Sequence, residues 1–201
     1  WSSDVCSSDL NWNTEIGILN FLPGGAHNVA NDKTKHLVRK WVPRVLRATA
    51  PRNSTNMDWI VFRVAELYLN YAEALNEYYE TPPKEAFDAV LKVRERSGMP
   101  GFPSTLNKEQ FREKLRRERA VELAYEDHRF WDIRRWLIAD DEGVMKGAMY
   151  GLQLSAVTGA PGKVHYKPYV FENRLWSDRS YLHPIKQTEI DKGYMLQNPG
   201  W

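Results

Sequence analysis

The chain has 201 residues, of which 42% are hydrophobic and 27% are charged, and its formal net charge is +2. This composition suffices for one domain with an apolar core, and the small net charge gives no electrostatic basis for binding nucleic acid. Cys6 is the only cysteine, which excludes an internal disulfide and a cysteine-based metal site. No apolar run approaches the ~18 residues of a membrane-spanning helix.

The N-terminal part is rich in residues that break regular structure. Residues 1–10, WSSDVCSSDL, are mainly Ser and Asp without periodicity, and we interpret them as a non-native or disordered tail that resembles translated adapter sequence. The absence of a targeting signal therefore carries no weight. Residues 11–57 contain Pro23-Gly24-Gly25, Pro43 and Pro51, which predicts loop with one or two short strands.

Residues 58–79 show the spacing of a helix that is apolar on two faces. Such a helix packs between neighbours on both sides. Alanines at 65, 72 and 74 would let those neighbours approach closely. One face carries Phe62, Ala65, Leu69, Ala72 and Asn76, and the other carries Leu67, Tyr71, Leu75 and Tyr78.

Three further helices are predicted by start and stop signals. The first follows Pro82-Pro83 and ends near Gly98 and Pro100. The second begins after Asn107 as N-cap, with Gln110 at the capping-box position, and runs to about Tyr125. The third covers about residues 129–139. Two helix pairs at a spacing of about 45 residues predict a mainly α fold of tetratricopeptide-like hairpins over about residues 58–139, with long irregular loops and few short strands. The inner stripe of the helix after Pro83 is expected to be Ala86, Ala89, Val90 and Val93.

After Asp140 the chain has scattered glycines, and we expect an irregular strap over residues 140–201. Near its end, Asn198-Pro199-Gly200 is a turn signal. Trp201 directly after this turn is placed to dock onto another part of the protein.

Residues 117–136, RERAVELAYEDHRFWDIRRW, combine many charged side chains with large apolar ones. Because burying an unpaired ion costs several kcal/mol, we expect these charges to form a structural ion-pair network. A metal site and an acid/base pair remain the alternatives, although the Glu-x-x-His motif of a di-metal bundle is absent. No catalytic motif and no cofactor-binding motif is visible elsewhere. The predicted network consists of Glu118, Arg119, Glu122, Glu126, Arg129, Asp132, Arg134 and Arg135.

Three motifs, in the expected order, resemble the C-terminal part of the SusD/RagB family. They are FRVAELYLNYAEALNE at residues 62–77, RERAVELAYE with HRFWD and RRW within residues 117–136, and a terminal set formed by LHPI, Glu189-Ile190 and QNPGW. Asp127 stands where the family usually has Gly, and Lys186 stands where Pro is usual. We expect Asp127 to extend its helix across the usual break.

The resemblance implies a surface-exposed lipoprotein of the outer membrane of Bacteroidota-type bacteria. Such proteins bind glycans or other nutrients, have no catalytic activity, and cover a SusC-like TonB-dependent transporter. Family members are longer than this chain, so residues 11–201 would be the C-terminal part of a SusD-like domain. The N-terminal lipid anchor, the only membrane attachment that the resemblance implies, would lie upstream.

Sugar faces rich in C–H groups pack on aromatic rings. The aromatic residues on breaker-rich segments are therefore the candidate ligand contacts. A helical-repeat adaptor for other proteins is the second functional interpretation, and a glycan-active hydrolase is the third. The candidate ligand-binding residues are Trp12, Trp41, Tyr150 and Trp176.

Overall fold

The computed structural model describes residues 33–34, 40, 60–158 and 164–201. These residues belong to two compact units. The helical unit contains Lys40 and residues 60–129, and the ribbon unit contains residues 33–34, 130–158 and 164–201. The described part is mainly helical, and its strands form a two-stranded sheet, as the sequence predicted for the fold class.

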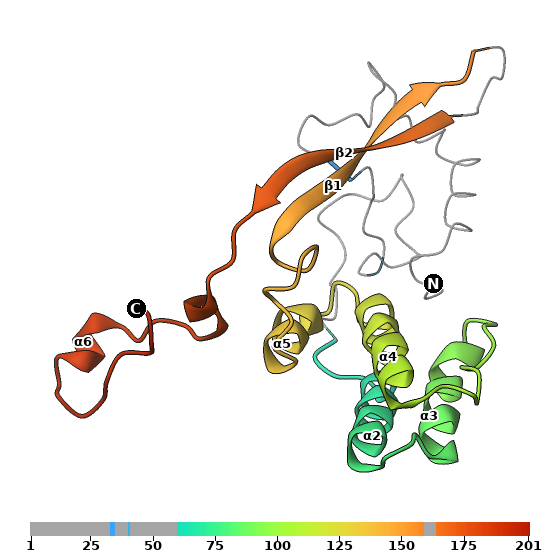
Figure 1. Cartoon of the computed structure of the whole chain (residues 1–201), viewed down its shortest axis with the longest axis horizontal. Coiled ribbons are helices and arrows are strands. Elements are labelled where there is room, and N and C mark those ends of the chain that lie inside the picture. The colour runs from blue at the N-terminus through green and yellow to red at the C-terminus, as the bar shows by residue number, and fades with distance from the viewer. Residues whose placement is uncertain (1–32, 35–39, 41–59, 159–163) are drawn as a thin grey trace, which may run out of the picture. The chain divides into compact units, whose positions relative to one another are not determined.

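The helical unit is built from α2 (Val64–Tyr78), α3 (Lys84–Glu95) and α4 (Lys108–Glu122). Figure 1 shows α2 beside α3 and α4, and α2 contacts both helices. Alanines at the contact faces, namely Ala72, Ala86 and Ala89, are buried. These small side chains allow the helix axes to approach closely.

The core of this unit lies between the three helices and the loop before α4. Phe111 on α4 is fully buried. Its ring lies edge-to-face with those of Phe87 and Phe102, at centroid distances of 4.9 Å and 5.7 Å. Such edge-to-face arrangements stabilise a core beyond the area they bury. The other buried members of this core are Leu69, Ala72, Ala86, Ala89, Val90, Val93, Leu115 and Leu123.

The local signals that predicted the helices are confirmed. Asn107 caps α4, and Gln110 completes the capping box, with both hydrogen bonds present. Every residue of the predicted inner stripe of α3 is buried. Gly98 ends the helical turn with a φ of 68°, a conformation that glycine adopts without steric cost.

Three helix boundaries differ from the prediction. The first helix begins at Val64 rather than near residue 58, after an extended Arg63 whose side chain makes ion pairs instead of a cap. Helix α4 ends at Glu122 rather than near Tyr125. The prediction that Asp127 extends the helix is wrong, because Tyr125 and Asp127 both have a φ of 63°, which no right-handed helix accommodates. The next helix, α5, spans His128–Arg135 and ends before Leu137, whose φ is 52°.

The ribbon unit contains an antiparallel hairpin of β1 (Gly147–Ala156) and β2 (Val164–Arg174), with an irregularity between Met149 and Tyr150. The sequence predicted irregular chain here. Gly151 is buried, and the Leu152 amide donates to the Lys33 carbonyl at 2.9 Å. A Cβ at residue 151 would lie 2.4 Å from that carbonyl oxygen, so only glycine permits this approach.

The tail after the hairpin holds a 3₁₀ turn, η2 (Asp178–Tyr181), and a short helix, α6 (Gln187–Ile190). The expected docking of Trp201 is confirmed: its indole N–H donates to the carbonyls of Arg179 at 2.9 Å and Leu182 at 3.1 Å. Gln197 exchanges hydrogen bonds with the backbone of Ile185. Within the described ranges, no helix has the length and apolarity needed to cross a bilayer.

Candidate functional site

Glu122, at the end of α4, is the centre of the charged cluster in the helical unit. Its buried carboxylate accepts hydrogen bonds from Arg63 Nη1 at 2.5 Å and from Arg96 Nη2 at 2.9 Å. Arg63 precedes α2 and Arg96 follows α3. One carboxylate therefore ties all three helices together, with the charge compensation that a buried ion requires.

The turn after α4 is held by two basic side chains from distant parts of the sequence. Lys40 Nζ donates to the carbonyls of Glu122 at 2.9 Å and Ala124 at 3.0 Å, and Arg63 Nη2 donates to the Glu122 carbonyl at 2.5 Å. Helix C-termini carry unpaired carbonyls and a partial negative charge, so both cations are favourable there. These contacts hold the two left-handed residues, Tyr125 and Asp127, in place.

Glu126 lies inside this turn and pairs with both cations. It accepts from Arg63 Nε at 2.7 Å and forms a salt bridge with Lys40. Burial would raise the pKa of Glu126, but the hydrogen bonds from Arg63 and Lys40 outweigh it and lower that pKa. Burial would lower the pKa of Arg63, whereas its bonds to Glu126 and Glu122 raise it. Both groups are charged at neutral pH.

The other members of the predicted network are dispersed. Glu118 pairs with Arg94 of α3, and buried Arg119 donates to Asn70 Oδ1 at 2.6 Å. In the ribbon unit, buried Asp132 pairs with Arg135 at 2.8 Å. Arg129 is an exposed residue of α5. Arg134 Nη1 donates to the Phe130 carbonyl at 2.9 Å. The structure thus brings Glu122 and Glu126 together, whereas Glu118, Arg119, Asp132 and Arg135 lie in separate pairs.

Sequence reasoning missed the main partners of these carboxylates, which are Lys40, Arg63, Arg94 and Arg96. The predicted network took its partners only from residues 117–136, because contacts between helix neighbours can be inferred from spacing. Arg63 lies at the start of the first family-like motif, which was the available signal for it. Lys40 lies in a breaker-rich segment that offered none.

The described residues contain no group of His, Cys, Asp and Glu side chains that could hold a metal ion. His128 contacts Glu66 at 3.5 Å. Every described carboxylate with a resolved pKa shift has a lowered pKa, because each accepts hydrogen bonds from a cation or a hydroxyl group. A general acid that works near neutral pH needs a raised pKa instead.

The predicted ligand contacts lie in different environments. Trp12 and Trp41 fall outside the described residues. Trp176 is half-buried, with its ring against the edge of Tyr181 at 5.2 Å and against the Arg134 guanidinium at 5.4 Å. Tyr150 is 64% exposed on β1. Of the described candidates, Tyr150 is thus the one whose ring is open to a ligand.

Tyr150 belongs to an apolar face of the hairpin, which we call the ribbon face. Side chains alternate between the faces of a strand, and paired residues share a face. Tyr166 lies on the ribbon face as the partner of Leu154 and is 66% exposed. From Tyr150 to Leu154 the ribbon extends ~14 Å. The ribbon face consists of Tyr150, Leu152, Leu154, Tyr166, Pro168 and Val170.

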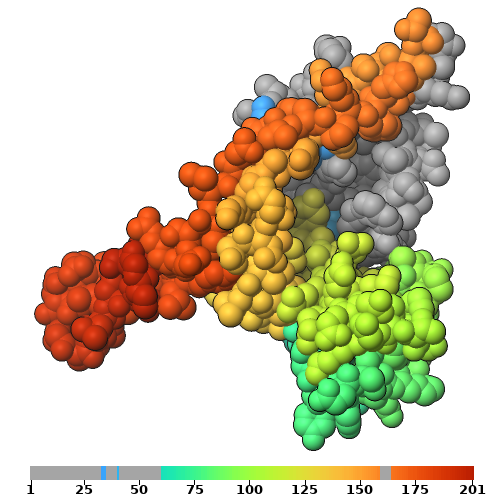
Figure 2. Space-filling model, viewed as in Figure 1, coloured from blue at the N-terminus to red at the C-terminus, as the bar shows by residue number. Residues whose placement is uncertain are grey.

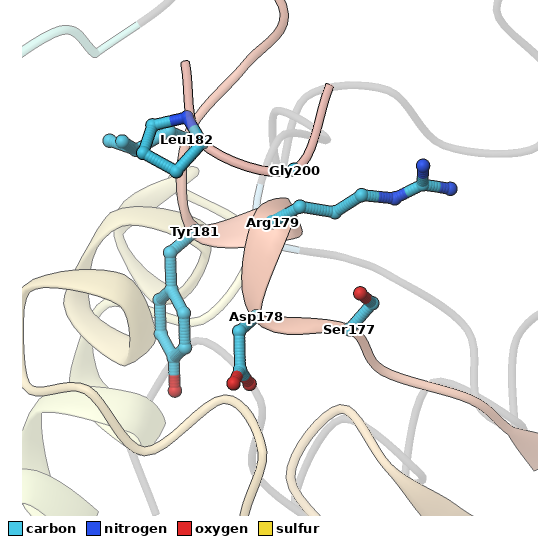
Figure 3. Close-up of a pocket in the computed structure, with 7 residues that line it drawn as sticks. Ser177, Asp178, Arg179, Tyr181, Leu182 and Gly200 are labelled. Atoms are coloured by element: carbon cyan, nitrogen blue, oxygen red, sulfur yellow. The ribbon is translucent and has the colours of Figure 1, made fainter.

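A pocket of about 590 Å³ lies between η2 and the C-terminal residues (Figure 3). The Tyr181 hydroxyl donates to Asp140 Oδ1 at 2.5 Å, which anchors η2 to the loop after α5, and Arg179 extends away from Tyr181. Gly200, with a φ of 85°, lets the chain pass close to Arg179. The pocket offers hydrogen-bonding groups beside apolar side chains. Its lining residues are Ser177, Asp178, Arg179, Tyr181, Leu182, Pro199 and Gly200.

Comparisons with known proteins identify the family. The chain is 40% identical to SusD-like protein P25 of Formosa agariphila over 95 residues, which are 46% of this chain and 18% of that protein. It is 30% identical to SusD-like protein P2 of the same organism, over 74% of this chain and 26% of that protein. The chain therefore spans about a quarter or less of these relatives.

The fold is similar to solved structures of the same kind. A SusD homolog from Bacteroides thetaiotaomicron matches with a TM-score of 0.52 and 30% identity, over 74% of this chain and 30% of that one. A SusD superfamily protein from Parabacteroides distasonis matches with a TM-score of 0.52 and 24% identity, over 73% and 28%. The model of the SusD family matches residues 10–201. This chain therefore belongs to the SusD family.

Proposed function

We propose that the protein binds glycans or related nutrients at the outer-membrane surface and delivers them to a SusC-like TonB-dependent transporter. The observation that carries this proposal is membership of the SusD family over residues 10–201. In this proposal the protein acts by binding its ligand rather than by catalysing a reaction. An N-terminal lipid anchor of the complete gene product would hold the protein at the membrane.

The ribbon face suits a sugar ligand. Tyr150 and Tyr166 present exposed rings at a spacing that an oligosaccharide of a few sugar units can bridge. The pyranose C–H face packs on such rings, and the tyrosine hydroxyls remain free to hydrogen-bond to sugar hydroxyls. We propose that these two tyrosines are this chain's main ligand contacts. Asp178 and Arg179, in the pocket between η2 and the C-terminal residues, would be secondary polar contacts.

Isothermal titration calorimetry of the complete gene product against a broad oligosaccharide panel tests the binding role. We expect one glycan class to bind, and the Tyr150→Ala and Tyr166→Ala variants to weaken it by about tenfold each. Tyr79→Ala is the matched control, because Tyr79 is an exposed tyrosine of the helical unit. If no glycan binds, the glycan function is refuted. If binding occurs but neither ribbon variant weakens it, the assignment of the ligand contacts is refuted.

The proposed surface location of the protein and its proposed complex with a transporter are tested in cells. Protease treatment of intact cells should remove the protein, because we place it on the outer surface. Solubilised outer membranes should yield a complex with a transporter of the TonB-dependent class. Recovery of the protein in the periplasm, or its purification without any transporter, would contradict this part of the proposal.

A further inference from the structure

Arg179, on η2, lies over the ring of Trp201 beside the pocket between η2 and the C-terminal residues. Its guanidinium carbon is 4.6 Å from the centroid of that ring. Figure 2 shows the tail that carries both residues, in red, exposed at one end of the ribbon unit. The cation–π attraction restrains the guanidinium. Because an indole offers no acceptor atom, the N–H donors of Arg179 keep their capacity for hydrogen bonds.

The ring of Trp201 is itself fixed by the backbone of the tail. Its indole N–H donates to the carbonyls of Arg179 at 2.9 Å and Leu182 at 3.1 Å. Gly200 permits this approach, because a Cβ at that position would lie 2.9 Å from the Cβ of Arg179. Arg179 therefore rests on an anchored ring rather than on a mobile one. Side chains that are ordered before binding lose less conformational entropy when a ligand arrives.

Among the described arginines of the ribbon unit, Arg179 is the one whose guanidinium has no hydrogen-bond acceptor. A guanidinium in this state can hold an oxyanion through two parallel hydrogen bonds, the geometry in which arginine binds carboxylate and phosphate groups. The acceptors of the other three are Glu172 for Arg174, Asp132 for Arg135 and the Phe130 carbonyl for Arg134.

The acidic residue of the pocket, Asp178, is directed away from Arg179. Figure 3 shows the side chain of Asp178 on the same side as that of Tyr181, whereas Arg179 extends in another direction. The Tyr181 hydroxyl already donates to Asp140, but the carboxylate of Asp178 can accept hydrogen bonds from hydroxyl groups. The pocket thus separates a group that attracts anions from a group that binds hydroxyls.

A ligand that satisfies both groups carries a negative charge and hydroxyl groups in one small molecule. The volume of the pocket, about 590 Å³, is within the range of small-molecule sites. We propose that this pocket binds an acidic sugar unit, with its carboxylate or sulfate group on Arg179 and a hydroxyl group on Asp178. This inference rests on the proposed glycan-binding function and adds to it the charge of the sugar.

Three probes that differ only in the group at carbon 6 test the inference: galactose, galacturonate and galactose 6-sulfate. Each is titrated into the complete gene product labelled with 5-fluorotryptophan, and the glucose series is tested in the same way. The fluorine NMR signal of Trp201, assigned by its loss in Trp201→Phe, reports binding at the pocket. We expect at least one acidic probe to bind with a Kd about tenfold or more below that of its neutral counterpart, and with a Kd that rises with salt.

Arg179→Gln should abolish this preference for the acidic probe. Arg174→Gln is the matched control, because it removes the same charge from the same unit while Arg174 is paired with Glu172. The control should keep the preference. A response to the uronates alone identifies a carboxylate as the bound anion, a response to the sulfated sugars alone identifies a sulfate ester, and a response to both identifies a pocket that accepts either group.

Three results would overturn the inference. They are equal affinities for neutral and acidic probes, a preference that survives Arg179→Gln, and a Trp201 signal that responds to no probe. Inorganic sulfate that binds as tightly as the sulfated sugars would also overturn it, because the pocket would then recognise an ion rather than a sugar. If an oligosaccharide still binds through Tyr150 and Tyr166, only the pocket assignment fails. If no oligosaccharide binds either, the glycan-binding function fails with it.

Discussion

Replacing Arg63 by methionine tests whether the cluster around Glu122 stabilises the helical unit. Methionine keeps the apolar stem of the side chain but removes its charge and donors. The wild-type guanidinium bonds to Glu122 Oε1, to the Glu122 carbonyl and to Glu126 Oε2 at 2.5–2.7 Å. The variant therefore removes three charge-assisted hydrogen bonds at once.

The expected loss of unfolding free energy depends on the ion pairs that Glu122 and Glu126 keep after the substitution. Removing one partner of a buried ion pair costs about 3–5 kcal/mol when the other charge is left uncompensated. Here Glu122 retains Arg96 and Glu126 retains Lys40. Arg63 is itself partly exposed, so water screens part of the interaction. We therefore expect Arg63→Met to lower the free energy of unfolding by about 2–3 kcal/mol.

The assay is urea unfolding followed by circular dichroism, with Arg112→Met as the control. Arg112 makes a comparable bidentate pair with Glu77, but both side chains are partly exposed, so its loss should cost only about 0–1 kcal/mol. If the two variants lose equal stability at pH 7, the cluster is no more important than a surface pair. That result would refute our account of the turn after α4.

The pH dependence of the unfolding free energy gives the same experiment a second readout. The pKa of Glu126 is lower in the folded state than its ordinary value near 4.5. Its contribution to stability is therefore present above the unfolded-state pKa and is lost as the pH falls through the folded-state pKa. Arg63→Met removes the first hydrogen bond that lowers this pKa, so the loss of stability in acid should be smaller in the variant than in the wild-type protein.

Three further substitutions test local features, each by the change in Tm or in hydrogen exchange. Asp127→Gly should raise stability by about 0.5–1 kcal/mol, because glycine adopts a φ of 63° without steric cost; a loss would contradict this. Asn107→Ala should cost about 1 kcal/mol through the lost cap of α4, and no loss would contradict the capping role. Gly151→Val should expose the Leu152 amide to exchange, since a Cβ cannot fit beside the Lys33 carbonyl; retained protection would refute the proposed close approach.

Features encoded by neighbouring residues were predictable from the sequence. The capping box of Asn107 and Gln110 lies within one helical turn, and the buried stripe of α3 follows from helix periodicity alone. The end of α4 was not predictable in this way. Its left-handed residues, Tyr125 and Asp127, are held by Lys40 and Arg63, which are distant in sequence. Only tertiary contacts determine that boundary.

The hairpin was missed for a related reason. Tyr150, Leu152 and Leu154 alternate with smaller or polar residues, which is the period of a strand. The surrounding glycines indicated irregular chain instead. In the structure, Gly147 has a φ of 86° at the strand start, and Gly151 admits the Lys33 carbonyl. A glycine that permits close backbone approach has the same sequence signature as one that breaks a strand.

The residues that identify the family differ from the residues that we expect to select a ligand. Glu118, Glu122 and Glu126 belong to a motif that carries the family resemblance, and each accepts hydrogen bonds from a basic side chain of the helical unit. The side chains of these carboxylates are also largely buried, at 15%, 4% and 3% exposure, so they offer little surface to a sugar hydroxyl. The motif can thus be retained among proteins with different ligands, because it stabilises the scaffold. The exposed rings of Tyr150 and Tyr166 carry no such structural constraint, so a change of ligand should alter the ribbon face and leave residues 117–126 intact.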